Sequence, residues 1–250
     1  MKIIHSRPEP SRFEVYLIKP TRYDDQGYPV RYWKGVLPSN TLCCLYGLTE
    51  HARREGALPG VDLRVHLLDE SVHKISVERL AKAASRRGTR VLACLVGVQT
   101  NQFSRARDLA LELRGHGITV MMGGFHVSGT LAMFREPTPE LRELLEAGVT
   151  LVAGEVEEHW TRLLQDAYSG NLQPLYNFLS ELPDLRQAPI PLTHPNYLRR
   201  FVFRRYATID TSRGCPYRCS FCTIINVQGR KMRYRSPECV ERLVRESYQR

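Results

Sequence analysis

The chain has 250 residues, a formal net charge of +10 and seven cysteines. This length allows one large domain, or a medium domain together with part of another. No apolar run approaches the ~20 residues of a membrane span and the N-terminus lacks the apolar core of a secretory signal, so we expect a soluble, cytoplasmic protein.

Strand and helix patterns alternate from Arg12 to about Pro174. The strand candidates are short apolar runs rich in β-branched residues: FEVYLIKP, DLRVHLLDE, RVLACLVGV, TVMMGGFH and TLVAGE. The helix candidates have helical apolar spacing and most end near glycine: SNTLCCLYGLTEHARREG, SVERLAKAASRRG, SRARDLALELRGHG, PELRELLEAG and EEHWTRLLQDAYSG. Ser39, Ser76 and Ser104 stand at expected N-caps. The alternation predicts an α/β fold with a doubly wound parallel sheet.

Ligands of such a sheet bind beyond the carboxyl ends of its strands. Three successive strands are followed by VQTNQFS, GGFHVSG and GEVEEH, and glycine recurs there at positions 97, 123, 124, 129 and 154. Glycine permits a sharp turn or the close approach of a ligand, and we favour a ligand-binding edge over turns alone. The candidate contacts are Gln99, Thr100, Asn101, Gly123, Gly124, Phe125, His126, Gly154 and Glu155. A turn-stabilising or solvent-facing role is the alternative for His126, and the absence of GxGxxG weakens a nicotinamide interpretation.

The proline-rich residues 175–205 lack sustained periodicity and are expected to form an ordered connector. We therefore divide the chain into an N-terminal tail (1–11), an α/β domain (12–174), the connector (175–205) and a second unit (206–250). In the second unit, YATIDTSRGCPYRC predicts a strand that enters a loop. SPECVERLVRESYQR then predicts a helix with Ser236 at the N-cap and Pro237 at the first helical position.

Cys215, Cys219 and Cys222 lie within eight residues of this loop. Thiolates bind soft metals, and such close spacing favours a metal or cofactor role over a disulfide framework. A structural zinc site needs a fourth ligand, but neither His194 nor Cys239 has the usual spacing. Ferredoxin motifs have two-residue gaps and supply a fourth cysteine.

The other signals favour less specific interpretations. Cys43, Cys44 and Cys94 lie in apolar stretches and are interpreted as buried packing residues. The basic residues are scattered, with the local exception RRFVFRRYA, so a nucleic-acid partner is not expected.

The Cx3Cx2C spacing between a strand and a helix is similar to the signature of the radical S-adenosylmethionine superfamily. The resemblance implies that Cys215, Cys219 and Cys222 hold three irons of a 4Fe-4S cluster, and that S-adenosylmethionine binds the fourth. Phe221 stands where the family usually has an aromatic residue. Residues 206–250 would then be the first β/α unit of a partial (β/α) barrel.

The α/β domain resembles the cobalamin-binding domain of the B12-binding radical S-adenosylmethionine proteins. The resemblance rests on GGFHVSG and GEVEE after successive strands, followed by the proline-rich connector and Cx3Cx2C. It implies a Rossmann-like parallel sheet of the cobalamin-binding type, followed by the start of a radical S-adenosylmethionine barrel. Two features depart from the pattern. DESVHKIS does not match DxHxxG, which implies cobalamin held without a histidine ligand or a domain that has lost it. Only the first barrel unit is present, so we expect an incomplete version of a longer protein that is inactive alone.

The resemblance implies a radical enzyme that generates a 5′-deoxyadenosyl radical for methylation or rearrangement of an unactivated carbon, with a small-molecule substrate and an electron donor such as flavodoxin or ferredoxin. One alternative is an enzyme like the radical methylthiotransferases of transfer RNA, indicated by CTIINVQGRKMRYRS and the basic charge. Those enzymes carry three more cluster cysteines near the N-terminus, where this chain has only Cys43, Cys44 and Cys94. A non-catalytic module that binds cobalamin or an iron–sulfur cluster is the other alternative.

Overall fold

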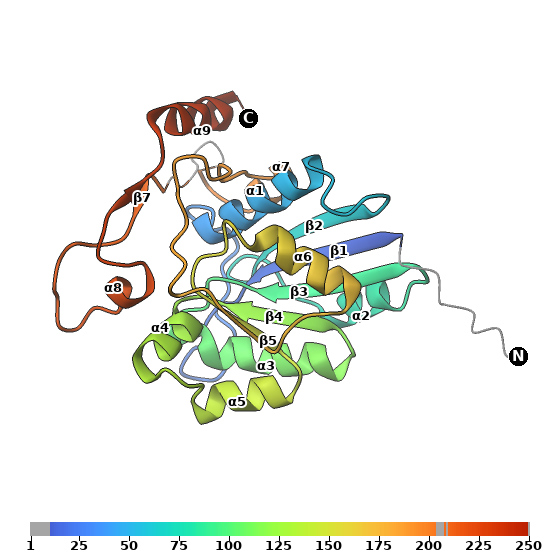
Figure 1. Ribbon diagram of the computed structural model, residues 1–250. Helices are drawn as coiled ribbons and strands as arrows, with labels where there is room; N and C mark the ends of the chain where they lie inside the picture. The colour runs from blue at the N-terminus through green and yellow to red at the C-terminus, as the bar shows by residue number, and fades with distance from the viewer. Residues whose placement is uncertain (1–10, 204–207, 209, 250) are drawn as a thin grey trace, which may run out of the picture.

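The structure is a computed structural model that describes residues 11–203, 208 and 210–249 (Figure 1). Nearly all of the predicted N-terminal tail, and part of the predicted strand that starts at Tyr206, lie outside these residues.

A parallel sheet of six strands forms the centre of the molecule, in the order β2-β1-β3-β4-β5-β6. The strands are β1 (Arg12–Lys19), β2 (Asp62–Asp69), β3 (Thr89–Leu95), β4 (Thr119–Gly123), β5 (Thr150–Ala153) and β6 (Leu175–Asn177). The strand order changes direction between β1 and β3. In an open α/β sheet such a switch point opens a crevice at the carboxyl ends of the strands. The parallel α/β prediction is confirmed.

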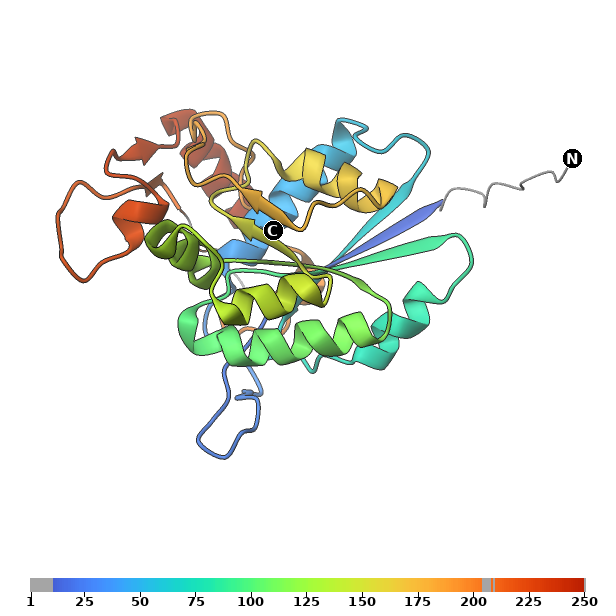
Figure 2. The same ribbon diagram turned by 60° about the horizontal axis from the view of Figure 1, so that its bottom comes forward.

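Helices cover both faces of the sheet (Figure 2). They are α1 (Asn40–Arg54), α2 (Val77–Ala84), α3 (Phe103–Gly115), α4 (Phe125–Phe134), α5 (Pro139–Glu146) and α6 (Trp160–Ser169), with the short 3-10 helix η1 (Thr100–Gln102) before α3. Apolar residues of α1 and α6 form one core with one face of the sheet, and those of α2, α3 and α5 form a second core on the other face. Burial on both faces explains why the inner strands β3, β4 and β5 are almost continuously apolar, whereas the edge strand β2 is partly exposed and half polar.

Three of the four predicted N-caps are confirmed. The side chains of Ser39, Ser76 and Ser236 accept hydrogen bonds from the backbone amides of Leu42, Arg79 and Cys239. The prediction for Ser104 was wrong, because α3 begins at Phe103, directly after η1, and Ser104 lies inside the helix.

The segment GGFHVSG is not a loop throughout. Helix α4 begins at Phe125 and includes His126 and Gly129, so only Gly124 lies between the end of β4 at Gly123 and the helix. Gly124 has φ 142°, a conformation that favours glycine, and no side chain caps the helix that follows. The usual N-terminal helix signal is therefore missing from the sequence.

The connector supplies an unpredicted strand, since β6 extends the sheet beside β5. After the short helix α7 (Pro195–Leu198), the C-terminal unit contains β7 (Ser212–Arg213), α8 (Ile224–Val227), β8 (Arg233–Tyr234) and α9 (Pro237–Gln249). In the described part of this unit, β7 and β8 form a separate antiparallel pair, so the start of a parallel barrel is not confirmed.

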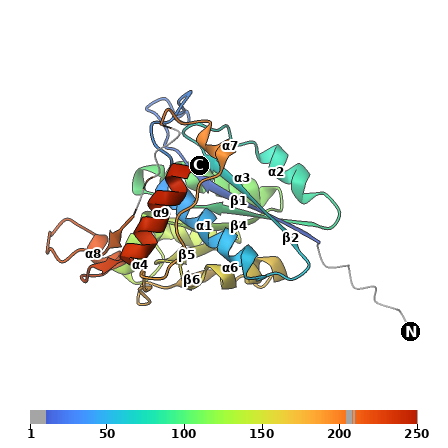
Figure 3. The same cartoon turned by 90° about the horizontal axis from the view of Figure 1, so that it is seen from above.

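Helix α9 lies over α1 (Figures 1 and 3). Cys239 and Leu243 of α9 are buried against Ile190 and Leu192 of the connector and against Tyr46 of α1. This apolar contact attaches the end of the described chain to the α/β domain. Within the described ranges, no helix has the length and apolar character needed to cross a membrane.

Candidate functional site

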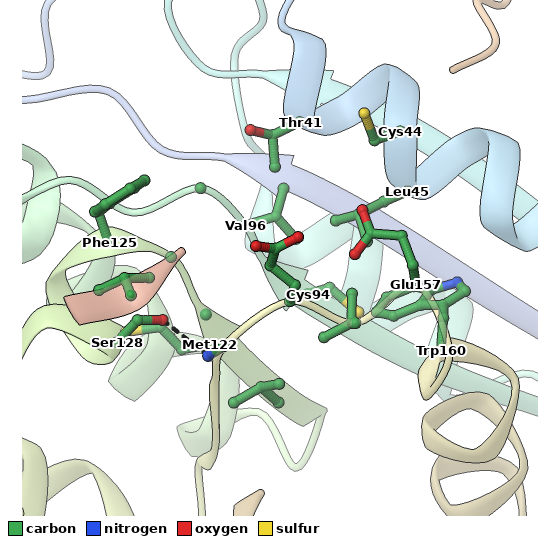
Figure 4. Close-up of a pocket in the computed structure, with 18 of the residues that line it drawn as sticks. Thr41, Cys44, Leu45, Cys94, Val96, Met122, Phe125, Ser128, Glu157 and Trp160 are labelled. Atoms are coloured by element: carbon green, nitrogen blue, oxygen red, sulfur yellow. Dashed lines mark hydrogen bonds between the residues drawn. The ribbon is translucent and has the colours of Figure 1, made fainter. Parts of the chain in front are cut away.

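A cavity of about 290 Å³ lies at the carboxyl ends of β3, β4 and β5, beside the N-terminal half of α1 (Figure 4). Its walls are mostly apolar and include Leu45, Val96, Met122, Val152 and Trp160. It lies at the crevice expected where the strand order changes direction.

Six of the nine predicted ligand-contacting residues line this cavity: Gln99, Gly123, Gly124, Phe125, Gly154 and Glu155. Three do not. Thr100 and Asn101 are exposed in η1, outside the lining. The ring of His126 stacks on Phe103 with the centroids 3.9 Å apart, also away from the lining. Burial lowers the pKa of His126 below its ordinary value.

The α1 wall of the cavity was not predicted. Asn40, Thr41 and Cys44 line the cavity because α1 begins at the same sheet edge, after the long loop that follows β1. That loop separates α1 from β1 in sequence, so no short motif marks the contact. Cys44 and Cys94 are buried as expected, yet both also line the cavity. Burial raises the pKa of each thiol above its ordinary value, which favours the neutral form.

The glycines at the cavity are required by packing of the protein on itself. A Cβ on Gly124 would lie 2.1 Å from the backbone nitrogen of Val98. A Cβ on Gly154, where φ is 94°, would lie 2.7 Å from the carbonyl carbon of Phe178. Side chains at these positions would collide with neighbouring backbone, so the glycines alone are not evidence of a ligand.

Polar groups of the cavity provide a better indication of a ligand. Asn40 Oδ1 is buried and has no hydrogen-bond partner in the described part of the chain. An unpaired buried acceptor costs free energy unless a donor reaches it. Ser128 Oγ is already occupied, because it accepts a hydrogen bond from the amide of Gly154 at 3.0 Å. The cavity therefore suits a largely apolar ligand part, and Asn40 is a lining residue that holds an unpaired buried acceptor.

A buried ion cluster borders the cavity on the side of the C-terminal unit. Arg213 Nη1 lies 2.8 Å from Glu155 Oε2 and 2.5 Å from Glu157 Oε1, and Nη2 lies 2.7 Å from Asp210 Oδ2. Arg233 also pairs with Glu155. Burial by itself lowers the pKa of Arg213, but Glu157 and the other neighbouring acidic groups outweigh it and hold the pKa above its ordinary value. The carboxylate of Glu155, predicted to contact a ligand, is instead occupied by two arginines.

The three clustered cysteines lie in the loop between β7 and β8, beside α4 (Figure 1). Cys219 is exposed, while Cys215 and Cys222 are partly exposed. In the described ranges, no three His, Cys, Asp or Glu side chains are grouped so that they could hold a metal ion, so the three thiols do not converge here. Phe221 is 88% exposed and contacts neither the cavity nor a core.

The segment after the last of these cysteines closes one side of the cavity. Val227 of α8 and the next residue, Gln228, line the cavity together with Arg213. Helix α8 packs against α4, whose first residue, Phe125, is also in the lining. The cysteine loop and the carboxyl edge of the sheet thus share one cavity, which motif spacing did not reveal.

No family model matches the chain. The chain is 28% identical over 163 residues to the bacteriochlorophyllide d C-8(2)-methyltransferase of Chlorobaculum tepidum, a match that covers 61% of this chain and 33% of that protein. It is 27% identical over 131 residues to the bacteriochlorophyllide d C-12(1)-methyltransferase of the same organism, covering 51% of this chain and 26% of that protein. The chain therefore spans a third or less of the length of the curated relatives it matches.

Proposed function

We propose that this chain is the part of a radical S-adenosylmethionine methyltransferase that binds a corrinoid and a 4Fe-4S cluster. One observation carries the proposal: residues that follow the Cx3Cx2C motif line a cavity at the carboxyl edge of an α/β sheet. A methyl-carrying cofactor and a radical-generating cluster must both reach one substrate, and a shared cavity supports that arrangement. The similarity to two methyltransferases also supports it.

The cavity fits part of a cobalamin. Its volume is at the lower end of the range for ligand pockets, so it would hold one arm of the cofactor and not the whole molecule. The amide side chains of a corrinoid are donors for the unpaired Asn40 Oδ1, and Gln99 lines the same cavity. Because His126 is outside the lining, it is not proposed as a cobalt ligand.

The cysteine loop fits an iron–sulfur cluster by the chemistry of its donors. Cys215, Cys219 and Cys222 would hold the cluster, since thiolates are the usual protein ligands of such clusters and all three are at least partly exposed. The loop would have to draw the thiols together to do so. When bound, the cluster supplies an electron for the cleavage of S-adenosylmethionine, and cobalamin supplies the methyl group.

The remaining parts of the proposal concern the whole protein. The names of the relatives support a small-molecule methyl acceptor. An electron donor such as flavodoxin or ferredoxin would reduce the cluster. Kinship with the transfer RNA methylthiotransferases has no support from the fold, because Cys43, Cys44 and Cys94 are buried in α1 and β3.

Iron and corrinoid analysis of the anaerobically reconstituted chain tests the proposal. We expect bound iron and saturable uptake of hydroxocobalamin. Alanine at Cys215, Cys219 or Cys222 should abolish the brown iron–sulfur absorbance. The matched control is Cys239→Ala, which changes a cysteine that is buried against the connector. A full cluster in all three single variants would refute the cluster assignment, and the absence of saturable corrinoid uptake would refute the cobalamin assignment.

A further inference from the structure

Two arginines face each other at the base of the cysteine loop. In the antiparallel β7–β8 pair, which we call the neck, Arg213 is directly opposite Arg233. Like charges at directly opposed positions destabilise a pair of strands. This neck has only two residues in each strand, so its backbone pairing alone cannot offset such repulsion.

Glu155 offsets the repulsion from outside the neck. Its carboxylate pairs with Arg213 through Oε2 and with Arg233 through Oε1. All three side chains are largely buried, with 6% of the Glu155 side chain exposed. Glu157 and Asp210 add two further carboxylates to Arg213, whereas Glu155 supplies the carboxylate of Arg233. Because Glu155 follows β5, the neck is attached to the end of a central strand of the sheet.

The neck in turn holds Val227 and Gln228, the residues that close one side of the cavity and that we call the roof. Arg233 Nη2 donates to the carbonyl of Gln228 at 3.2 Å, and the amide of Cys215 donates to the carbonyl of Gly229 at 3.1 Å. Gln228 and Arg213 both line the cavity. One set of contacts therefore joins the first clustered cysteine, the roof and the sheet edge.

We propose that Glu155 is a positioning residue: it latches the Arg213–Arg233 neck to the sheet and so couples occupancy of the cavity to the conformation of the cysteine loop (residues 214–232). Without the latch the neck is held more weakly, and the loop keeps only the packing of α8 on α4 and the pairs of Arg213 with Glu157 and Asp210. A ligand in the cavity contacts the roof and strengthens the latch. The second half of the inference rests on the proposed function, because it requires a corrinoid in the cavity.

Hydrogen exchange of the chain without ligand tests the latch by itself. In Glu155→Gln, the hydrogen-bonded amides of residues 214–232, such as those of Cys215 and Gln228, should exchange roughly tenfold faster. The free energy lost when one partner of a buried charge pair is removed exceeds the free energy that corresponds to a tenfold change. Amides of β1 and β3 should be unchanged. The control is Arg245→Gln, which breaks the exposed Arg245–Glu241 pair of α9 and should leave the loop unchanged. Unchanged exchange of the loop in Glu155→Gln would overturn the proposal.

A double variant distinguishes two roles of Glu155: offsetting the repulsion between the opposed arginines, or only contributing ion pairs. Glu155→Gln leaves the buried Arg233 without a carboxylate, directly opposite Arg213, which keeps its pairs with Glu157 and Asp210. Glu155→Gln with Arg233→Gln removes that unpaired charge and the repulsion with it. We therefore expect the loop to exchange more slowly in the double variant than in Glu155→Gln. If Glu155 only contributed ion pairs, the second substitution would leave exchange unchanged or accelerate it, and that result would also overturn the proposal.

Thiol alkylation tests the coupling to the cavity. Hydroxocobalamin should slow the reaction of iodoacetamide with Cys215, Cys219 and Cys222 at least threefold in the unaltered chain, as measured by mass spectrometry, and should have little effect in Glu155→Gln. If the corrinoid binds but the alkylation rate does not change, the coupling is refuted while the proposed function stands. If no corrinoid binds, both the cobalamin assignment and the coupling between the corrinoid and the loop are refuted. The hydrogen-exchange experiments, which need no ligand, would still test whether Glu155 latches the neck to the sheet.

Discussion

The indole Nε1 of Trp160 donates a hydrogen bond to Thr49 Oγ1 at 2.8 Å, and this contact joins α6 to α1 beneath the cavity. Both residues are buried. Thr49 Oγ1 in turn donates to the carbonyl of Leu45 at 2.7 Å. One hydroxyl thus satisfies two groups in an otherwise apolar contact between the helices.

Replacing Thr49 by valine keeps the side-chain volume and leaves the indole N–H without a partner. We expect Thr49→Val to lower the free energy of unfolding by about 1–3 kcal/mol, the cost of an unsatisfied buried donor. Urea denaturation measures the change. Thr49→Ser retains the hydroxyl and should lose clearly less stability. Equal stability of Thr49→Val and the unaltered chain would contradict the role assigned to this hydrogen bond.

Trp160 also provides an optical probe of the cavity. The chain has two tryptophans; Trp160 lines the cavity and Trp33 is 84% exposed. In Trp33→Phe, hydroxocobalamin should quench the fluorescence of Trp160 in a saturable manner, because a corrin absorbs light and would lie close to the indole. In Trp160→Phe, quenching of Trp33 should be weaker and should rise linearly with concentration. Saturable quenching of equal depth in both variants would place the ligand elsewhere.

Two glycines near the same edge should respond in opposite ways to alanine. Gly124→Ala places a Cβ against the backbone of Val98 at a positive φ, so we expect a loss of about 1–3 kcal/mol or more in unfolding free energy. Gly129 is inside α4, and a Cβ added there would have no neighbouring atom within 4 Å, so Gly129→Ala should stabilise by about 0.5–1 kcal/mol. Thermal unfolding of the two variants checks the signs. A stable Gly124→Ala would contradict the packing described here.

Acid should destabilise the protein partly through His126. Burial lowers the pKa of this histidine in the folded state, so the unfolded chain binds its proton at a higher pH. The resulting decrease in the free energy of unfolding is absent well above about pH 6.5. It grows as the pH falls through that value and is complete below the pKa of the folded state. His126→Phe retains an aromatic ring beside Phe103 and removes this titration.

Unfolding free energies at pH 7.5 and pH 5.5 measure this effect. The decrease in unfolding free energy from pH 7.5 to pH 5.5 should be smaller in His126→Phe than in the unaltered chain. Some loss should remain, because burial also lowers the pKa of His66 and of His73. An identical pH dependence in His126→Phe would show that His126 does not contribute.

Local patterns in the sequence were sufficient to predict the parallel α/β sheet. Apolar, β-branched runs become strands buried on both faces, and the side chains of Ser39 and Ser76 cap their helices within three residues. These signals act over a few residues, so they can be read without knowledge of the fold. The same patterns predicted which residues follow the strands at the carboxyl edge of the sheet, and six of the predicted ligand contacts line the cavity there.

The sequence did not predict elements that depend on contacts with residues distant in the chain. Helix α4 lacks a capping side chain, and β6 has three residues that become a strand only because β5 lies beside them. The spacing of Cys215, Cys219 and Cys222 indicates a cluster but does not by itself bring the thiols together.

The latch gives the clearest case of what tertiary structure alone decided. Glu155 is 58 residues from Arg213 and 78 from Arg233, and the sequence indicated only a candidate ligand contact. The environment of Glu155 depends on where the β7–β8 pair returns to the carboxyl edge of the sheet. A carboxylate that meets two opposed arginines out of water must pair with them, because leaving Glu155 or Arg233 buried and unpaired would cost about 3–5 kcal/mol.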